Sequence, residues 1–298
     1  MELKFQTEKL LHPKLRKTLL FMNHSDQLGE LRKAIDVLDG SLLDLLNERA
    51  RLAQEIGRIK ERSGCPVYVP GRAEQLMRRL VAQNKGPLDE AAIRAIYREI
   101  MSASLALEKD TLIAVEGNVA GLTHLAAKQH FGSSVRYGFY DEAAQLFESV
   151  ALGSADCGVI SFGEDGPDAK ILELLTEGST AARVFLCSQI VLSGEKGNMS
   201  IRYLVLGPSL NAPSGDDQTA LLIHLDDQPG ALAKALDPFR MDGVNVLSIH
   251  SRRSNRGGLH LMLEIEGHAG ESLVRKSLET LKSVGMNPMV CGSYPRFH

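Results

Sequence analysis

The segment LGELRKAIDVLDGSLLDLLNERARLAQEIGRI, residues 28–59, decides how the first part of this chain folds. Every third or fourth residue lies on one seam, the pattern of a helix that buries an apolar stripe. The seam consists of Leu28, Leu31, Ile35, Leu38, Leu42, Leu45, Arg49, Leu52, Ile56 and Ile59. With Asp26 as its cap and no proline before Pro66, the pattern predicts one helix of about 35 residues, roughly 50 Å long. A small globule cannot bury such a helix alone, so we expect it to pack against the same helix of a second copy.

Arg49 places a charge within this apolar seam. A buried charge is costly unless it is paired, and one interpretation is a structural ion pair or a polar residue that fixes the register. The alternative is a ligand, because Arg32 and Lys60 flank the same seam four heptads apart. Lys60 lies roughly 16 Å beyond Arg49, so the two long side chains can both contact a small anion between them. Arg32 lies roughly 25 Å from Arg49 on the other side and cannot reach the same ligand within one chain. An antiparallel second copy could supply Arg32, so the pattern predicts a homodimer with shared sites.

A second, shorter helix is predicted from about Gly71 to Gln83, after the turn that ends at Pro66. Arg72 stands at its start, where the helix dipole disfavours a cation. Its one charged neighbour, Glu74, points to a different side of the helix. The partner of Arg72 is therefore predicted to be a ligand.

The tract NKGPLDE then breaks the chain and caps a third helix, residues 88–109. Ser104 and Glu108 lie four residues apart on it and face the same way. A three-helix unit that gathers these side chains with the cations named above is predicted to bind a small polyanion.

Residues 28–109 resemble the all-helical chorismate mutases, specifically the mutase domain of bifunctional chorismate mutase–prephenate dehydratases. The stretches LRKAIDVLDGSLLDLLNERARLAQEIGRIK, CPVYVPGR and REIMSASLALEK carry the resemblance. It implies an intertwined dimer and a dicarboxylate substrate. The implied binding residues are Arg32 of the other subunit, Arg49, Lys60, Arg72, Ser104 and Glu108.

The implied reaction is the Claisen rearrangement of chorismate to prephenate, which needs no nucleophile, metal or cofactor. Arg32, Arg49 and Arg72 would hold the two carboxylates so that the substrate stays in its chair-like conformer. Lys60 and Glu108 would stabilise the charge that grows on the ether oxygen. Glu108 could donate a hydrogen bond only when protonated, a form that burial favours.

Two positions depart from the mutase pattern. Val69 and Ala73 stand where the family usually carries acids beside the C4 hydroxyl of the substrate. One interpretation is drift in a mutase that tolerates weaker hydroxyl binding. The alternative is a different C4 substituent, since the pattern is similar to that of the 4-amino-4-deoxychorismate mutases of p-aminophenylalanine pathways.

Residues 111–210 alternate strand and helix signals and resemble a shortened prephenate dehydratase domain, one periplasmic-binding-like α/β lobe instead of two. The family motif GPEGTFSH reads GNVAGLTH at 117–124, and the loop after the third strand reads ISFGEDG at 160–166. The catalytic Thr-Arg-Phe reads Ile201-Arg202-Tyr203. We therefore expect no dehydratase activity, with Arg202 retained for structure.

Residues 216–298 show the strand–helix–strand–strand–helix–strand order of a ferredoxin-like fold and are similar to ACT domains. Gly230-Ala231-Leu232 matches the motif of the phenylalanine-binding version, with helix N-terminal amides available for a carboxylate. The companion motif reads His250-Ser251-Arg252-Arg253 and has lost both ends, and Ser251 and Arg252 are its candidate effector contacts. An amino-acid effector, another effector or a purely dimerising role all remain open, and His250 is predicted to be an ordinary strand residue.

Composition bounds these interpretations. The 298 residues carry a net charge of −3, which argues against a nucleic-acid partner, and no apolar run is long enough to span a membrane. Four scattered cysteines indicate reduced thiols and neither a zinc site nor a disulfide scaffold. We expect a cytoplasmic enzyme with an N-terminal extension (1–25) of unknown role and domains at 26–110, 111–210 and 216–298. The remaining alternative is a non-catalytic metabolite sensor that acts through its ACT domain.

Overall fold

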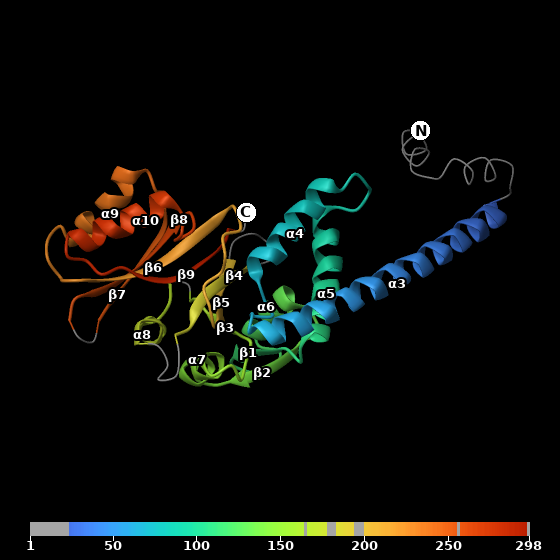
Figure 1. Cartoon of the computed structure of the whole chain (residues 1–298), viewed down its shortest axis with the longest axis horizontal. Helices are drawn as coiled ribbons and strands as arrows, with labels where there is room; N and C mark the ends of the chain where they lie inside the picture. Colours follow the sequence, from blue (N-terminus) through green and yellow to red (C-terminus); the bar gives the residue numbers. More distant parts are fainter. Residues whose placement is uncertain (1–23, 164–165, 178–182, 194–199, 255–256, 297–298) are drawn as a thin grey trace. The chain divides into compact units, whose positions relative to one another are not determined.

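A computed structural model of the chain describes residues 24–163, 166–177, 183–193, 200–254 and 257–296. The elements, in chain order, are α3 (His24–Ser63), α4 (Pro70–Gln83), α5 (Glu90–Glu108), β1 (Leu112–Glu116), α6 (Leu122–Phe131), β2 (Arg136–Tyr140), α7 (Ala143–Ala151), β3 (Cys157–Ser161), α8 (Ala169–Glu177), β4 (Phe185–Ser193), β5 (Ser200–Gly207), β6 (Asp217–Leu225), α9 (Ala231–Asp242), β7 (Val246–Arg253), β8 (Leu259–Glu266), α10 (Ser272–Ser283) and β9 (Met289–Pro295) (Figure 1). This order confirms the predicted multidomain α and α/β fold class.

The chain divides into two compact units, residues 1–52 and 53–298. The domain boundaries proposed from the sequence stay a prediction, and the extension before residue 24 lies outside the described residues. Among the helices of the described ranges, none combines the length and apolar character needed to cross a membrane.

The helix α3 is uninterrupted over 40 residues. Within the described residues it runs from His24, so Asp26 already lies inside the helix, where a carboxylate in the first turn suits the helix dipole. The prediction that Asp26 is the cap is therefore wrong. The apolar seam is confirmed as one stripe of a helix. Its side chains are exposed apart from the half-buried Leu31 and Arg49, for example Leu38 at 67%, Leu45 at 63% and Ile59 at 57%. An apolar stripe of this length on a single chain is a surface that a partner would cover.

The other two predicted helices of the first domain are confirmed. Pro70 occupies the first turn of α4, where its missing N–H costs nothing. Asp89 caps α5 by accepting a hydrogen bond from the backbone N–H of Ala92 at 2.7 Å. The helices α3 and α5 meet at Gly57, where an added Cβ would lie 2.5 Å from the carbonyl oxygen of Glu108. Only glycine allows the two backbones to come this close.

The first sheet has the strand order β2-β1-β3-β5-β4. The strands β1, β2 and β3 are parallel, and β5 runs antiparallel to both β3 and β4. Alternate residues point to opposite faces, as strand geometry requires. One face carries Ile113 and Val159 and packs against α6, whereas the other carries Ala114 and Ile160 and packs against α7 and α8.

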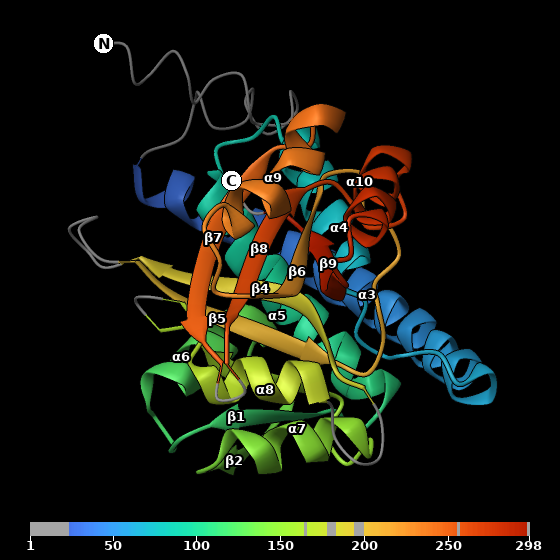
Figure 2. The same cartoon turned by 90° about the vertical axis from the view of Figure 1, so that its left-hand side faces the viewer.

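The second sheet has the order β7-β8-β6-β9 and is antiparallel throughout. The helices α9 and α10 lie side by side on one of its faces, over Leu221 and Ile223 (Figure 2). With the helices placed between strands in the predicted order, residues 217–295 form the predicted ferredoxin-like fold.

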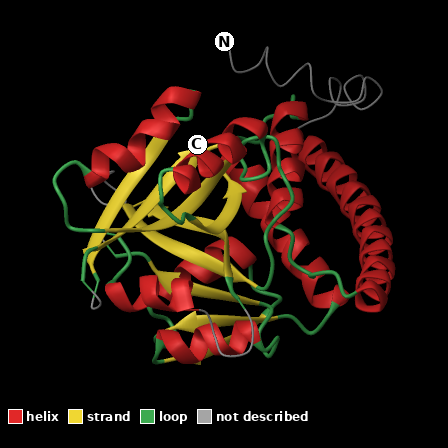
Figure 3. Ribbon diagram, turned by 60° about the vertical axis from the view of Figure 1, so that its left-hand side comes forward, coloured by secondary structure: helices red, strands yellow, loops and turns green. Residues whose placement is uncertain are grey.

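The two sheets share a hydrophobic core, which the sequence did not predict. Leu222, Met262 and Tyr294, on the face of the second sheet that α9 and α10 leave uncovered, join the cluster formed by the first sheet with α7 and α8. The strands β4 and β9 cross there, and a Cβ on Gly292 would overlap the carbonyl oxygen of Leu186. Figure 3 shows the two sheets in yellow, with the helices in red around them. One face of the remaining lobe is therefore covered by the C-terminal fold.

Candidate functional site

The candidate catalytic pair is formed by Lys60, near the end of α3, and Glu108, at the end of α5. The Lys60 Nζ donates to Glu108 Oε2 at 2.7 Å and to the Val67 carbonyl oxygen at 2.7 Å. The two side chains are only 21% and 10% exposed, so the ion pair is largely withdrawn from water. An ammonium has three N–H donors. Within the described residues two are used, which leaves one for a ligand.

Close packing of α3 on α5 positions this pair. Gly57 lies one turn before Lys60 and permits contact with the backbone of Glu108, so that the lysine reaches the carboxylate across the helix junction. Ser104 lies one turn before Glu108 and is buried, and its hydroxyl donates to the Ile100 carbonyl oxygen at 2.8 Å. Gly57 is a site residue that the sequence analysis missed, because a glycine inside a helical pattern does not reveal what approaches it.

Arg72 is exposed on the first turn of α4, and among the described residues no carboxylate forms an ion pair with it. The nearest acid in the sequence, Glu74, is buried and pairs instead with Arg78 and Arg94, at 3.2 and 3.7 Å. Arg72 is therefore available to an anionic ligand. The half-buried Val69 precedes α4 as its cap residue, and no side chain caps this helix.

Ala73 is half-buried on the first turn of α4. Arg32 and Arg49 belong to the first unit, where Arg32 is exposed and Arg49 half-buried on α3. How these two arginines stand relative to Lys60 and Arg72 stays a prediction. The structure thus brings together Lys60 and Glu108 and places Arg72 on the adjoining helix.

The arginine of the altered dehydratase motif is paired with a carboxylate of the C-terminal domain. Arg202 on β5 donates to both carboxylate oxygens of Glu264 on β8, at 3.1 and 2.6 Å. It also donates to Gln189 Oε1 at 2.7 Å, and its guanidinium lies 4.3 Å from the centre of the Phe162 ring. The prediction of a structural role for Arg202 agrees with this geometry, since a bidentate pair with a buried carboxylate satisfies the cation.

Glu264 is the centre of this cluster and was missed by the sequence analysis. Burial alone would raise the pKa of Glu264. The hydrogen bonds and the positive charge of Arg202 outweigh burial, and hydrogen bonds from Ser248 and Tyr294 add to them, so the pKa of Glu264 lies below its usual value. Burial and the Glu264 charge raise the pKa of Tyr294. A carboxylate inside the apolar run LHLMLEIE was the available signal, since such a residue needs a partner.

The candidate effector residues lie on β7 and at the start of α9. Gly230 adopts a left-handed conformation with φ 84°, and the backbone N–H of Ala231 donates to the Gln228 carbonyl oxygen, so that amide is already used. Leu232 is exposed. His250 packs its ring against Phe162, 5.0 Å between centres, which agrees with the interpretation of an ordinary strand residue.

Ser251 is exposed and Arg252 half-buried on β7. Arg252 donates to the carbonyl oxygen of Ser251 at 3.2 Å. Nothing in this geometry selects among the effector alternatives, and effector binding stays a prediction. The ISFGEDG loop lies partly outside the described residues, at 164–165.

Comparison with known proteins agrees with these features. The family model of chorismate mutase type II matches residues 31–109, and that of the ACT domain matches residues 219–283. The bifunctional chorismate mutase/prephenate dehydratase of Aquifex aeolicus is 30% identical, over 91% of this chain and 98% of the relative. That alignment is 356 positions long, longer than this chain of 298 residues, so the relative carries residues with no counterpart here.

Solved structures show the same fold for the second part of the chain. Prephenate dehydratase from Streptococcus mutans matches with a TM-score of 0.52 at 23% identity, over 62% of this chain and 100% of that one. A structure described as GqqA, a novel type of quorum-quenching acylase, matches with a TM-score of 0.54 at 23% identity, over 62% and 95%. At this identity, these likenesses show the fold alone.

The relative's match runs through the helical domain, the lobe and the ferredoxin-like domain together. The lobe and the C-terminal domain have the fold of prephenate dehydratases, and the helical domain matches the mutase model. This chain therefore belongs to the bifunctional chorismate mutase/prephenate dehydratase family, as an enzyme of the chorismate mutase class whose dehydratase-like part is shortened.

Proposed function

We propose that the enzyme converts chorismate to prephenate. The observation that carries this proposal is the Lys60–Glu108 pair, which is withdrawn from water and keeps one N–H donor. Arg72 on the first turn of α4, which has no ion-pair partner among the described residues, adds a cation for the substrate. In the rearrangement the ether C–O bond breaks as a C–C bond forms, and negative charge grows on the ether oxygen. A fixed cation aimed at that oxygen stabilises the transition state more than the ground state.

The remaining roles follow from the charge of the substrate. Arg72, Arg49 and Arg32 of a second copy would hold the two carboxylates and keep the reacting carbons close together. Glu108 would address the ether oxygen together with Lys60, with Ser104 supporting the helix turn on which Glu108 lies. No step in this scheme uses a metal or a cofactor.

A homodimer follows from the surface of α3. Apart from the half-buried Leu31, its seam leucines and isoleucines are exposed, and a second copy of the same seam is the complementary surface that a heptad pattern predicts. An antiparallel pairing would bring Arg32 of one copy to the site formed by the other. The dimer and the catalytic site are therefore one proposal.

The second candidate substrate is 4-amino-4-deoxychorismate. It is favoured by Val69 and Ala73, two half-buried residues without polar side-chain groups at the positions expected beside the C4 substituent. The neighbouring acid, Glu74, is held by Arg78 and Arg94 and points to other partners. A ring carrying an amino group in place of the hydroxyl would meet a site that lacks the usual acids.

We further propose that the chain does not dehydrate prephenate. Arg202, the remaining member of the altered motif, is neutralised by Glu264 of the C-terminal domain, and that domain covers one face of the lobe. Together with the changed motif residues, this leaves no free cation on β5 for the carboxylates of prephenate.

One set of assays tests these proposals. Loss of the conjugated diene absorbance, measured for purified protein with each substrate, gives kcat/KM for chorismate and for its 4-amino analogue. The main proposal expects turnover of chorismate, and a clear preference for the analogue would replace it with the second candidate. Turnover of neither would leave the sensor alternative. Formation of phenylpyruvate from prephenate would contradict the proposed loss of dehydratase activity.

A further inference from the structure

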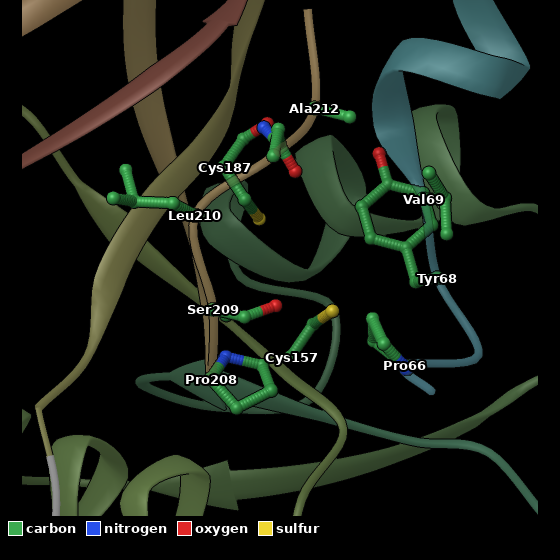
Figure 4. Close-up of a pocket in the computed structure, with 11 residues that line it drawn as sticks. Pro66, Tyr68, Val69, Cys157, Cys187, Pro208, Ser209, Leu210 and Ala212 are labelled. Atoms are coloured by element: carbon green, nitrogen blue, oxygen red, sulfur yellow. The ribbon is translucent and has the colours of Figure 1, made fainter. Parts of the chain in front are cut away.

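A cavity lies where three parts of the second unit meet. It has a volume of about 250 Å³. Its walls come from the segment 66–69 before α4, from β3 and β4, and from the segment 207–212 that leads from β5 to β6 (Figure 4). The first segment belongs to the mutase part, the strands to the dehydratase-like lobe, and the last leads into the ACT domain. The predicted effector motif does not use this cavity, and Val69 is the one lining residue that also belongs to the proposed substrate site.

The lining excludes a charged ligand. Its eleven residues are Pro66, Tyr68, Val69, Cys157, Cys187, Gly207, Pro208, Ser209, Leu210, Asn211 and Ala212, none of which carries a charge. A carboxylate or ammonium placed there would lose its hydration without gaining an ionic partner. The dicarboxylate substrate and free amino acids are therefore unsuited to it.

Two buried thiols form the inner wall. Cys157 and Cys187 are 2% and 3% exposed, and both side chains reach the cavity beside Ser209 (Figure 4). Gly207 lies between them, and a Cβ there would approach Cys187 Sγ to 3.2 Å, so the missing side chain keeps the inner end open. The hydrogen bond with Cys187 and burial raise the pKa of Cys157, which keeps its thiol neutral.

Aromatic and proline surfaces form the outer wall. Tyr68 presents a ring that is fixed on its other side by Phe131, at 4.9 Å between centres, and by a hydrogen bond of its hydroxyl to His130 at 2.5 Å. A fixed ring next to Pro66 and Pro208 suits a flat apolar molecule, and the two thiols and the Ser209 hydroxyl can meet a single polar group. The lining therefore fits a small uncharged aromatic ligand.

The cavity wall is bonded directly to the proposed catalytic pair. The Val67 carbonyl oxygen, between two lining residues, accepts the 2.7 Å hydrogen bond from Lys60 Nζ. The Val69 carbonyl oxygen accepts from the backbone N–H groups of Arg72 and Ala73 and so begins α4. A molecule that pushes on 66–69 would move an acceptor of Lys60 and the first turn that carries Arg72.

We propose that this cavity is an effector site for a small uncharged aromatic molecule, whose binding alters the mutase reaction through the segment 66–69. The site itself is independent of the proposed function, whereas its effect on turnover rests on it.

The binding part is tested with indole as the probe and with the chain's own cysteines as reporters. In a Cys65→Ser variant, which removes the exposed thiol, the protein is treated with methyl methanethiosulfonate. The attacking thiolate forms a protein–S–S–CH₃ disulfide and releases methanesulfinate, and the thiol proton goes to solvent. Cys291 is as buried as the other two but does not line the cavity, and it serves as the internal control.

We expect Cys157 and Cys187 to be modified faster than Cys291, as read by peptide mass spectrometry. Indole at ten times its dissociation constant should slow modification of the first two about tenfold and leave Cys291 unchanged. Equal rates for all three thiols, or no protection by indole, would overturn the binding site.

The coupling part compares diene loss with and without indole. We expect kcat or KM to change about fivefold or more on saturation. Ser209→Phe, which puts a large side chain into the cavity beside the two thiols, should abolish both thiol protection and the kinetic effect, and Ser283→Phe at the end of α10 should abolish neither. Protection without any kinetic change would overturn the coupling. If neither diene substrate is turned over, the proposed function fails while the labelling experiment still decides the site.

Discussion

At the residue scale, Lys60 is the side chain on which the proposed chemistry depends most. Lys60→Met removes the cation from the ether oxygen and keeps most of the side-chain volume, so kcat should fall about 10²–10³-fold. Diene-loss kinetics measure this, and circular dichroism checks the fold, because Glu108 loses its partner in the variant. Lys85→Met, in the exposed loop between α4 and α5, is the matched control and should stay within about twofold of wild type.

Glu108 supplies a second prediction at this scale. Glu108→Gln keeps the length of the side chain and can still donate a hydrogen bond to the ether oxygen, whereas Glu108→Ala removes both this contact and the partner of Lys60. Diene-loss kinetics should therefore show a larger fall in kcat for Glu108→Ala than for Glu108→Gln. Equal activities of the two variants would remove Glu108 from the proposed mechanism.

Lys60 and Glu108 could be found from the sequence because heptad and four-residue spacings fix which way a helical side chain points. Their meeting could be predicted only from the family resemblance. Glu264 was missed, because its role depends on Arg202, a residue 62 positions away on another sheet. Local spacing carries no information about such a partner.

At the element scale, the close approach of α3 and α5 should control both stability and activity. Gly57→Ala puts a methyl group 2.5 Å from the Glu108 carbonyl oxygen. The helices must separate, which should cost about 1–3 kcal/mol of unfolding free energy and lower kcat by moving Lys60 from Glu108. Urea denaturation and diene loss measure the two effects.

The same helix provides the control for this change. Gly40 has nothing within 4 Å of an added Cβ. Gly40→Ala should therefore stabilise the protein by roughly 0.5–1 kcal/mol, because alanine favours the helix. If both alanine variants behaved alike, the approach at Gly57 would not be the cause.

The junction between α6 and the segment before α4 should be sensitive to acid. Burial lowers the pKa of His130 from 6.5 to about 4, and its Nε2 pairs with the Tyr68 hydroxyl. Between pH 6.5 and about 4 the unfolded chain binds a proton on this histidine that the folded chain does not. The contribution of neutral His130 to the free energy of unfolding is therefore fully present above pH 6.5 and is lost as the pH falls toward 4. The loss from this group should reach up to about 3 kcal/mol.

His130→Gln removes the titrating group and keeps a hydrogen-bonding side chain. Urea unfolding at about pH 7 and about pH 4.5 should show a smaller loss of stability for the variant than for wild type. An equal loss in both proteins would assign the acid sensitivity to other groups.

The elements themselves were largely predictable, since strand alternation and helix periodicity are local. Proline at the start of α4 and Asp89 at the start of α5 mark their boundaries in the sequence. The prediction that Asp26 caps α3 was wrong, because aspartate is favoured both at a cap and in the first turn of a helix.

At the scale of the whole molecule, the sequence indicated three folds in a row but not how two of them share a core. Leu222 and Tyr294 read as ordinary alternating strand residues, yet they contribute to the same cluster as Leu186. The contact depends on Gly292, whose missing side chain lets β9 cross β4. Packing between sheets depends on three-dimensional shape, which periodicity does not report.

The seam of α3 gives the next prediction at this scale. Leu45→Glu places a charge in the centre of the proposed dimer interface and should convert the dimer to a monomer without mutase activity. Val37→Glu changes a residue that is 71% exposed and off the seam, and it should leave the dimer intact. Sedimentation velocity distinguishes these outcomes, and a wild-type protein that sediments as a monomer would contradict the shared site.

The shared site itself is tested by mixing two inactive variants, Arg32→Ala and Lys60→Met. After unfolding and joint refolding, a mixed dimer holds one site built from the intact Lys60 of one chain and the intact Arg32 of the other. Since half of the dimers are mixed and each has one complete site, activity should return to about a quarter of wild type. If Arg32 acted within its own chain, every site in the mixture would lack one of the two cations and no activity would return. Recovery of diene loss therefore shows whether one site is built from two chains.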